Sequence, residues 1–527
     1  MAHGEEEGQG SQGGEISLGA LPLVQQLQRS QARRVARFHT PGHQGGQGSG
    51  LPLKTAWGEA VWQWDLPELP ELGSLLDPDG VMAEAQALAA QTFGADRTWF
   101  LANGSTLGVM AAIVATCAPG SKLVLPRSVH RSAIAGLIVS GAVPIFVNPP
   151  YDADWDLPGT LTPQAVVAAL AEHPDVAAVL LVSPTYQGVV AEVAAIAALT
   201  QARGIPLLVD EAHGAHFGFH PQLPPRALSQ GADLAVQSTH KTLSALTQAA
   251  MVHIRGTRVD PQSLTRAVAL VQSTSPSYLL LASLDAARHQ LATQGQDLMA
   301  QTLALAQIAC DRIGQIPGLR VWAPSPPRSG FRQGDPTRLT VDVSGLGWSG
   351  FAADEWLDRS QGVICELPSL RHLTFMVTLG HTADDIASLV RGLEHLSRQH
   401  PSPSQGGSFA LENLALENLA LENLALENLA LENLALGSPS PLAPLTPRQA
   451  FFAPGETVPW QQGLHRLSAE LICPYPPGIP LVLPGEPITA MAWEQLQRVQ
   501  AAGGVITGCA DPSLMTVRVV RDSGVQS

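Results

Sequence analysis

Lysine is nearly absent from this chain of 527 residues, in which only Lys54, Lys122 and Lys241 occur. Any mechanism that needs a side-chain amine therefore has three candidates. Charged residues make up only 14% of the chain, and the net charge is −15. Because nucleic-acid binding needs clustered cationic side chains that replace phosphate counterions, we expect no nucleic-acid partner. The acidic balance is compatible with a cationic substrate.

Cysteine is also sparse: the five cysteines are scattered, with no Cys-x-x-Cys pair. This pattern favours neither a disulfide framework nor a zinc ribbon, and we expect no metal site. No apolar run reaches the roughly 18 residues that a membrane-spanning helix needs, so we expect no membrane association. The acidic, glycine-rich residues 1–16 lack the features of a secretory leader and are expected to be a disordered tail. We therefore expect a cytoplasmic protein.

A regular alternation of helices and strands begins near residue 80. The order predicts a mainly parallel sheet with helices on both faces, forming a large domain over residues 80–299. Ligands bind such sheets at the carboxyl ends of the strands. The expected strands are 99–102, 122–125, 143–147, 179–182, 207–209, 235–237 and 250–254, and the expected helices are 81–93, 105–118, 131–140 and 193–203.

The rest of the chain divides into shorter regions. An N-terminal segment, 17–79, begins with a helix at 21–36. A smaller α/β domain is expected over 300–400, and a C-terminal α+β module over 446–527, with a short strand at 481–483. The smaller domain is expected to contain helices at 300–314 and 350–358 and strands at 338–343 and 374–377.

Residues 401–445 differ in kind, because the pentad Leu-Glu-Asn-Leu-Ala is repeated between Leu411 and Ala435. A five-residue step rotates by about 140° on a helix once full turns are removed, so the leucines make no continuous apolar face. We interpret the repeat as a linker without chemistry. An oligomerising solenoid is a weaker alternative.

Two polar residues follow buried strands of the predicted sheet. Asp210 ends the strand at 207–209, and Lys241 follows the strand at 235–237. Pyridoxal phosphate (PLP) needs a lysine amine to hold its aldehyde as a Schiff base and a carboxylate beside its ring nitrogen. The pair therefore predicts a PLP site with Lys241 and Asp210 as its central residues.

A phosphate group is bound by free N–H groups and hydroxyls at the start of a helix. Gly104, Ser105 and Thr106 lie between a strand and an alanine-rich helix and offer both. Taken alone, they could equally be an ordinary helix cap. Ser238 and His240, which flank the lysine region, are further candidates for the phosphate.

The chain resembles the ornithine/lysine/arginine decarboxylase family, PLP-dependent enzymes of aspartate-aminotransferase fold (fold type I). It resembles the short form, which has no N-terminal wing domain. The resemblance covers nearly all of the chain outside the tail and the pentad repeat. The matching segments are FHTPGHQGG (38–46), DLPELPELGSLLDPDG (65–80), AQTFGADRTWFLANGST (90–106), SVHRS (128–132), SPTYQGV (183–189), VDEAHGAHFGFHP (209–221), QSTHKTLSALTQ (237–248) and PYPPGIPLVLPGE (474–486).

The resemblance implies roles for further residues. His130 would stack on the cofactor ring, and His213 would lie near its hydroxyl side. Glu486 would face the distal cation of the substrate, although it could also be a solvated turn residue. His43 would line the substrate site, or could merely cap its turn.

The implied activity is the PLP-dependent decarboxylation of a basic amino acid to an amine and CO₂, which would feed polyamine synthesis. The short form favours arginine over lysine and ornithine. A homodimer or higher homo-oligomer is expected, since active sites of this fold lie at a dimer interface. Another PLP reaction such as transamination, or a non-catalytic PLP-binding regulator, remains as an alternative.

Overall fold

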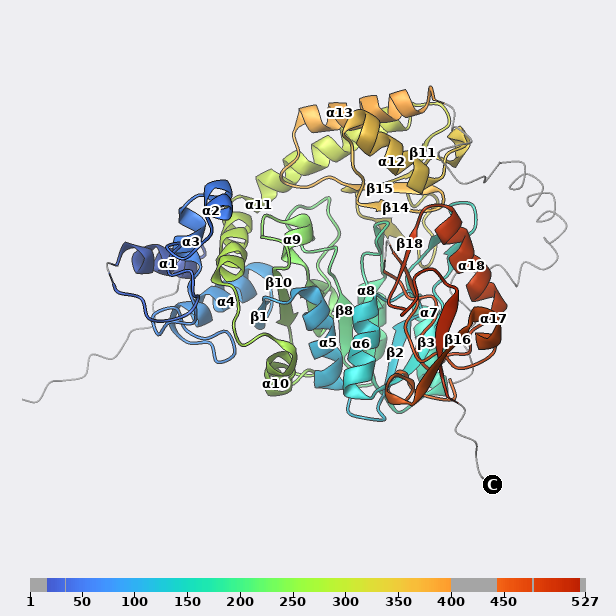
Figure 1. Cartoon of the computed structure of the whole chain (residues 1–527), viewed down its shortest axis with the longest axis horizontal. Helices are drawn as coiled ribbons and strands as arrows, with labels where there is room; N and C mark the ends of the chain where they lie inside the picture. The colour runs from blue at the N-terminus through green and yellow to red at the C-terminus, as the bar shows by residue number, and fades with distance from the viewer. Residues whose placement is uncertain (1–16, 34, 400–442, 476–477, 522–527) are drawn as a thin grey trace, which may run out of the picture.

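The computed structural model describes residues 17–33, 35–399, 443–475 and 478–521. Its centre is a seven-stranded sheet in the order β1–β10–β9–β8–β6–β2–β3 (Figure 1). Each neighbouring pair from β9 to β3 is parallel, which confirms the predicted mainly parallel sheet. The strands are β1 (Arg97–Leu101), β2 (Lys122–Pro126), β3 (Val143–Val147), β6 (Val176–Val182), β8 (Leu207–Asp210), β9 (Leu234–Gln237) and β10 (Ala250–Ile254).

β10 is antiparallel to both of its neighbours, β9 and β1. The sequence pattern had placed this strand in the same series as the others. The connection from β9 contains only the four-residue helix α9 (Thr239–Thr242). A parallel return needs a full crossover, usually with a long helix, so the chain turns back instead.

Apolar side chains along each strand alternate between two cores. Leu123 and Leu125 of β2 belong to the core under α5 (Gly104–Thr116), α6 (Arg131–Ser140) and α10 (Pro261–Val271). Val124, between them, belongs to the core on the opposite face, under α7 (Pro163–Glu172) and α8 (Val193–Gln201). The two faces are therefore both covered by helices, as predicted.

A chain of buried polar side chains crosses four neighbouring strands of the sheet. Thr98 Oγ1 lies 2.7 Å from His253 Nδ1, and His253 Nε2 lies 3.2 Å from Gln237 Oε1. The Gln237 amide donates to Glu211 Oε2 at 2.8 Å, and the N–H of Ala227 donates to Glu211 Oε1 at 2.9 Å. All of these polar side chains are at least 98% buried, so each depends on the next for its hydrogen bonds.

A single 36-residue helix, α11 (Tyr278–Ile313), joins the large domain to a second sheet. The helix expected at 300–314 is only its second half, and the predicted domain boundary at 299 falls inside it. Its first half packs with α4 (Gly80–Phe93), and its second half packs on the second sheet. That sheet contains β11 (Arg320–Val321), β13 (Arg338–Asp342), β15 (His372–Met376) and β14 (Leu367–Pro368), covered by α12 (Gly350–Gln361) and α13 (Ala383–Leu396).

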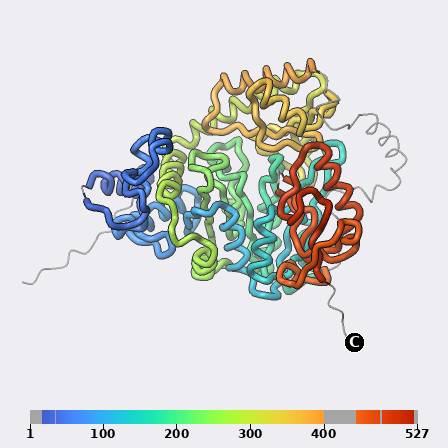
Figure 2. The backbone as a smooth tube through the Cα atoms, viewed as in Figure 1, coloured from blue at the N-terminus to red at the C-terminus, as the bar shows by residue number. Residues whose placement is uncertain are grey.

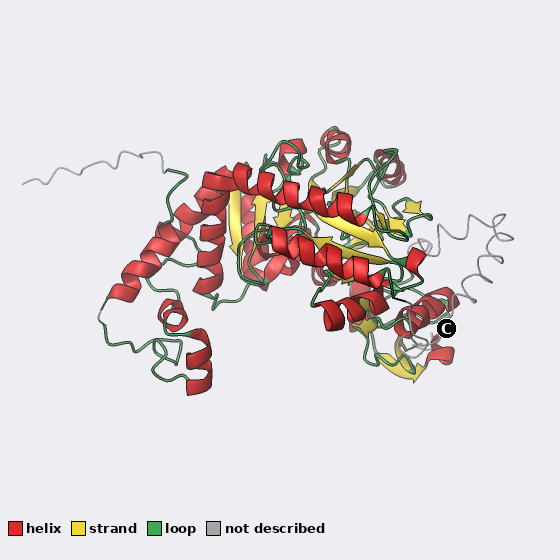
Figure 3. Ribbon diagram, turned by 90° about the horizontal axis from the view of Figure 1, so that it is seen from above, coloured by secondary structure: helices red, strands yellow, loops and turns green. Residues whose placement is uncertain are grey.

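The N-terminal segment forms an arm that projects from the body beyond α11 (Figure 3). It contains α1 (Pro22–Ala32), α2 (Leu51–Trp57) and α3 (Ala60–Trp64). The helix expected at 21–36 therefore ends at Ala32. Residues 1–16, expected to be a tail, lie outside the described residues.

The C-terminal module lies against the large domain beside α6 (Figure 2). Residues 481–483 were expected to form a strand but make a single β-bridge, between Val482 and Ile472. The flanking Pro480 and Pro484 lack the N–H groups that would extend a ladder. The pentad repeat lies outside the described residues. The module contains α16 (Pro447–Phe452), β16 (Gly455–Pro459), α17 (Trp460–Gly463), β17 (Cys473–Tyr475), α18 (Ala490–Ala501), β18 (Val505–Thr507) and β19 (Thr516–Val520).

Candidate active site

Lys241 lies on α9, directly after β9, at the carboxyl edge of the central sheet. Its Nζ atom lies 2.9 Å from Nε2 of His213, which follows the neighbouring strand β8. Burial lowers the pKa of the Lys241 amine, and the charge of Asp210 opposes that shift. The sequence-predicted lysine, Asp210 and His213 therefore share one site.

Asp210 is only 8% exposed. Among the described residues, its side chain accepts one hydrogen bond, from the N–H of Ala212 at 3.1 Å. Burial raises the pKa of this carboxyl group, while the charge of Lys241 lowers it. A buried carboxylate with so few donors is stabilised by a cationic partner, and a protonated pyridine nitrogen fits that requirement.

The N-terminus of α5 offers an anion-binding site. Gly104 has φ +76°, and a Cβ there would meet nothing closer than the Gln248 carbonyl oxygen at 3.8 Å. No side chain caps this helix. Ser238 Oγ donates to Ser105 Oγ at 2.6 Å, which brings these predicted phosphate residues together. Thr106, also on the first turn, is exposed, and the first N–H groups of the helix have no side-chain partner, so this helix end can bind an anion.

His240 has a fixed orientation. Its Nδ1 lies 3.0 Å from the carbonyl oxygen of Ala249 and must donate to it, because a carbonyl only accepts. In the neutral ring Nε2 is then an acceptor. Burial lowers the pKa of His240, which favours that neutral ring. A phosphate contact through Nε2 would need the protonated form.

His130 caps the N-terminus of α6, with Nδ1 accepting from the N–H of Ser132 at 3.3 Å. Burial, followed by the charges of Lys241 and Arg131, lowers the pKa of His130 to about 4. The ring is therefore neutral at physiological pH. Gly478 of the C-terminal module lies against its edge, where an added Cβ would be 3.5 Å from the ring.

Three residues at this site were missed by sequence reasoning. Arg338, which begins β13, donates from Nη2 to His213 Nδ1 at 2.6 Å. The Tyr186 ring lies 4.8 Å from the His213 ring, and the charge of Glu366 acts on Lys241. The sequence does show an arginine at the start of an apolar strand, which could have marked Arg338 as unusual. Its partner His213 is 125 residues away, so the contact itself could not be predicted.

Glu486 and His43 do not join the cluster around Lys241 within the described part of one chain. Glu486 Oε2 pairs with Arg127 Nη2 at 3.0 Å. His43 Nε2 lies 3.0 Å from Asp65 Oδ2 in the N-terminal arm, and its Nδ1 accepts from the N–H of Gly46. The second contact is the turn cap that was the alternative role for His43.

Two sequence models of one family match the chain. The model described as Orn/Lys/Arg decarboxylase, major domain, matches residues 21–327, and the one described as the C-terminal domain matches residues 440–506. The arginine decarboxylase of Bacillus subtilis (strain 168) is 35% identical over 511 residues, which is 96% of this chain and 99% of that protein. The chain belongs to the ornithine/lysine/arginine decarboxylase family.

More distant members agree with this assignment. The constitutive lysine decarboxylase of Escherichia coli (strain K12) is 26% identical over 89% of this chain and 75% of that protein. The solved structure of lysine decarboxylase A from Pseudomonas aeruginosa matches with a TM-score of 0.79 at 23% identity. It covers 95% of this chain and 81% of that one. The predicted family and fold type I are therefore confirmed, and the family consists of PLP-dependent decarboxylases of basic amino acids.

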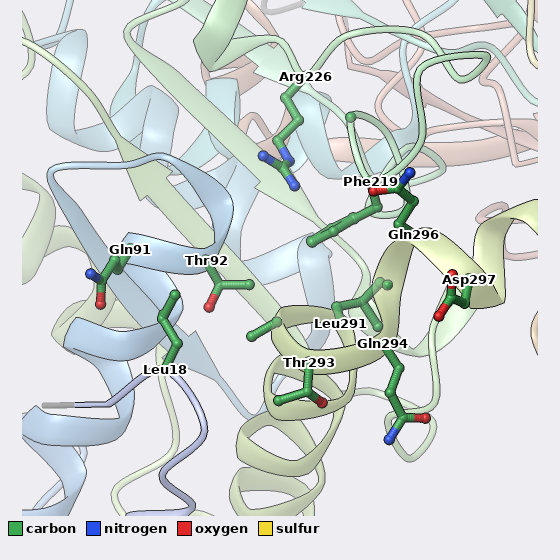
Figure 4. Close-up of a pocket in the computed structure, with 13 residues that line it drawn as sticks. Leu18, Gln91, Thr92, Phe219, Arg226, Leu291, Thr293, Gln294, Gln296 and Asp297 are labelled. Carbon is green, nitrogen blue, oxygen red and sulfur yellow. The ribbon is translucent and has the colours of Figure 1, made fainter.

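A separate pocket of about 530 Å³ lies between the end of α4 and the middle of α11 (Figure 4). Arg226 and Phe219 reach into it, with the guanidinium 4.1 Å above the ring. None of the predicted decarboxylase site residues lines it. Within the described ranges, no group of three or more His, Cys, Asp or Glu side chains could hold a metal ion. No helix in those ranges is long and apolar enough to cross a membrane.

Proposed function

We propose that this chain decarboxylates a basic L-amino acid, with arginine preferred over lysine and ornithine, and uses PLP held by Lys241. The observation that carries the proposal is the meeting of Lys241, His213 and Asp210 at one edge of the sheet, beside the uncapped α5. The preference for arginine is supported by the relative at 35% identity, which is named arginine decarboxylase.

The cofactor would occupy the space among residues of several elements. Asp210 would face its ring nitrogen, His130 its ring, and His213 its hydroxyl side. The phosphate would lie at the start of α5 against Gly104, Ser105, Thr106, Ser238 and His240. When bound, PLP supplies an electron sink for the charge left on Cα as CO₂ departs.

The residues of this chain orient the substrate and move protons. The buried Asp210 carboxylate would hold a positive charge beside it throughout the reaction. The neutral His130, packed against Gly478, would cover one side of the site. Lys241, or a neighbouring histidine, would return a proton to Cα. Holding the reacting groups in place accounts for much of such a rate increase.

A substrate with a distal cation needs an opposite charge near its far end. We propose Glu486 for this role, through Oε1, the oxygen that Arg127 does not bind. We also propose that the chain forms a homodimer and that His43, in the projecting arm, lines the substrate site of the partner. The products would feed polyamine synthesis in the cytoplasm.

The test is to supply purified full-length protein with arginine, lysine and ornithine and measure released CO₂ and amine. We expect release that is fastest with arginine and abolished by Lys241→Ala. Lys122→Ala, which removes an exposed ion pair with Asp175, should leave it unchanged. A keto acid in place of CO₂ would establish transamination, and no product at all would favour a regulator.

A further inference from the structure

Arg338, His213 and Lys241 form a chain of hydrogen bonds in the protein interior. Arg338 Nη2 lies 2.6 Å from His213 Nδ1, and His213 Nε2 lies 2.9 Å from Lys241 Nζ. Arg338 is 4% exposed and His213 is 5% exposed, so each group must find its partner within this chain.

The direction of each hydrogen bond follows from the first. A guanidinium can only donate, so His213 Nδ1 must be the acceptor. A neutral imidazole has one acceptor nitrogen, and Nδ1 is already used. His213 Nε2 therefore carries the ring proton and points it at Lys241 Nζ. To receive it, the amine must offer its lone pair, which an ammonium group does not have.

We propose that Arg338 is a positioning residue that fixes the tautomer of His213 and thereby holds Lys241 as a free amine at neutral pH. The inference rests on the proposed function, because a free amine matters most where Lys241 captures PLP. Only the lone pair of the free amine can attack the aldehyde carbon; the two amine protons then leave with the aldehyde oxygen as water.

Other charged groups around Lys241 act in both directions. Asp210, at the end of β8, and Glu366, before β14, favour the ammonium form. Arg338 on β13 disfavours it, and the neutral His130 and His240 lie nearby. Among the described residues, only His213 makes a hydrogen bond to Nζ.

The scarcity of lysine makes a direct measurement possible. Trace acetylation of the full chain over a range of pH, read by peptide mass spectrometry, gives the reactivity of Lys241 with Lys54 and Lys122 as internal references. The measurement is made on the protein as purified and again after bound cofactor is removed with hydroxylamine. If Lys241 is equally reactive in both samples, PLP is not attached to it and the proposed function fails. The pH midpoint of Lys241 labelling still reports on the hydrogen bonds from Arg338 through His213 to Lys241.

We expect Arg338→Met and His213→Phe each to raise the midpoint of Lys241 labelling by about one pH unit. That corresponds to about a tenfold loss of reactivity at neutral pH. Because the two residues act in series, the double variant should shift no further than either single variant. Arg338→Lys and His213→Gln keep a donor at each point and should stay near the wild-type midpoint.

Two results would overturn the inference. An unchanged midpoint in His213→Phe would mean that burial alone sets the state of Lys241. Additive shifts in the double variant would mean that Arg338 acts through its charge and not through His213. If Arg338→Met does not fold, the comparison of His213→Gln with His213→Phe decides the question, because neither changes Arg338. The pH profile of PLP capture by the same variants gives a second readout.

Discussion

The two oxygens of the Glu486 carboxylate have different surroundings. Oε2 binds Arg127 Nη2 at 3.0 Å and accepts from the N–H of Leu483 at 3.1 Å. In the described part of the chain, no group binds Oε1. The Arg127 guanidinium also donates to the carbonyls of Pro480 and Leu481, so it holds this loop in place. The pair thus fixes the direction of the one oxygen left for a substrate cation.

Glu486→Gln should lower kcat/KM for arginine by about ten- to a hundredfold, since a hydrogen bond to a charged group contributes about 1.5–3 kcal/mol. Steady-state kinetics with arginine measures the effect. Glu470→Gln is a matched control: Glu470 lies in the same module, and among the described residues its side chain accepts only from the N–H groups of Ala510 and Arg518. Glu470→Gln should lower the free energy of unfolding and leave kcat/KM for arginine unchanged. Equal kinetic losses in both variants would show that Glu486 only supports the fold.

How well a residue can be predicted depends on whether its chemistry is local. Lys241 and Asp210 follow buried strands, and the cofactor needs both groups, so the sequence is enough to pair them. Arg338 could not be found in this way, because its contact with His213 depends on how the second sheet meets the first. The partner of Glu486 was hidden for the same reason, since Arg127 is 359 residues away.

Among the elements, the polar chain through Thr98, His253, Gln237 and Glu211 crosses the sheet just below the site. Burial lowers the pKa of His253 to about 3 and raises the pKa of Glu211 to about 7. The folded protein therefore binds a proton on Glu211 more tightly than the unfolded chain does between about pH 4.5 and 7. That preference stabilises the fold at low pH and is lost as the pH rises through 7.

Glu211→Gln removes this titration, and the Gln237 amide can turn to keep the chain of hydrogen bonds. The stability of the wild type relative to this variant should fall by up to about 3 kcal/mol as the pH rises through this window. Denaturant unfolding at a series of pH values measures it. Glu355→Gln, an exposed change on α12, should run parallel to the wild type. Parallel curves for Glu211→Gln would mean that Glu211 stays ionised in the fold, stabilised by Arg226.

The positions of the helices and strands could be predicted from the apolar pattern of the sequence. The direction of a strand could not, because it depends on the connection that leads to it. Short apolar runs located the strands of the large sheet to within a few residues. The reversed direction of β10 follows from the short connection after β9, which carries no periodic signal. The predicted boundary at 299 falls inside α11, whose helical pattern continues while its buried side chains pass from one core at Leu303 to the other at Ala306.

On the scale of the whole molecule, the N-terminal arm leaves large apolar side chains in contact with water. Phe38 is 97% exposed, Leu51 76% and Trp57 56%. Exposed apolar groups gathered on one projection are typical of a binding surface. In the proposed homodimer, a second copy of this chain would cover these side chains of the arm.

Phe38→Ser combined with Leu51→Ser should raise the dimer dissociation constant by roughly a hundred- to ten-thousandfold, because burying each side chain contributes about 1.5–3 kcal/mol. Analytical ultracentrifugation over a dilution series measures it. Met515→Ser is the matched control, since Met515 is 73% exposed but lies in the C-terminal module. An unchanged dimer in the arm variant would place the contact elsewhere.

The long helix α11 has a consequence for how the protein melts. Its first half supplies Leu281, Leu284 and Leu291 to one core, while Ala309 and Ile313 of its second half belong to another. Neither core can lose this helix without exposing apolar surface in the other. A helix shared in this way couples the two cores, so the main body should unfold as one cooperative unit even though it contains two large sheets.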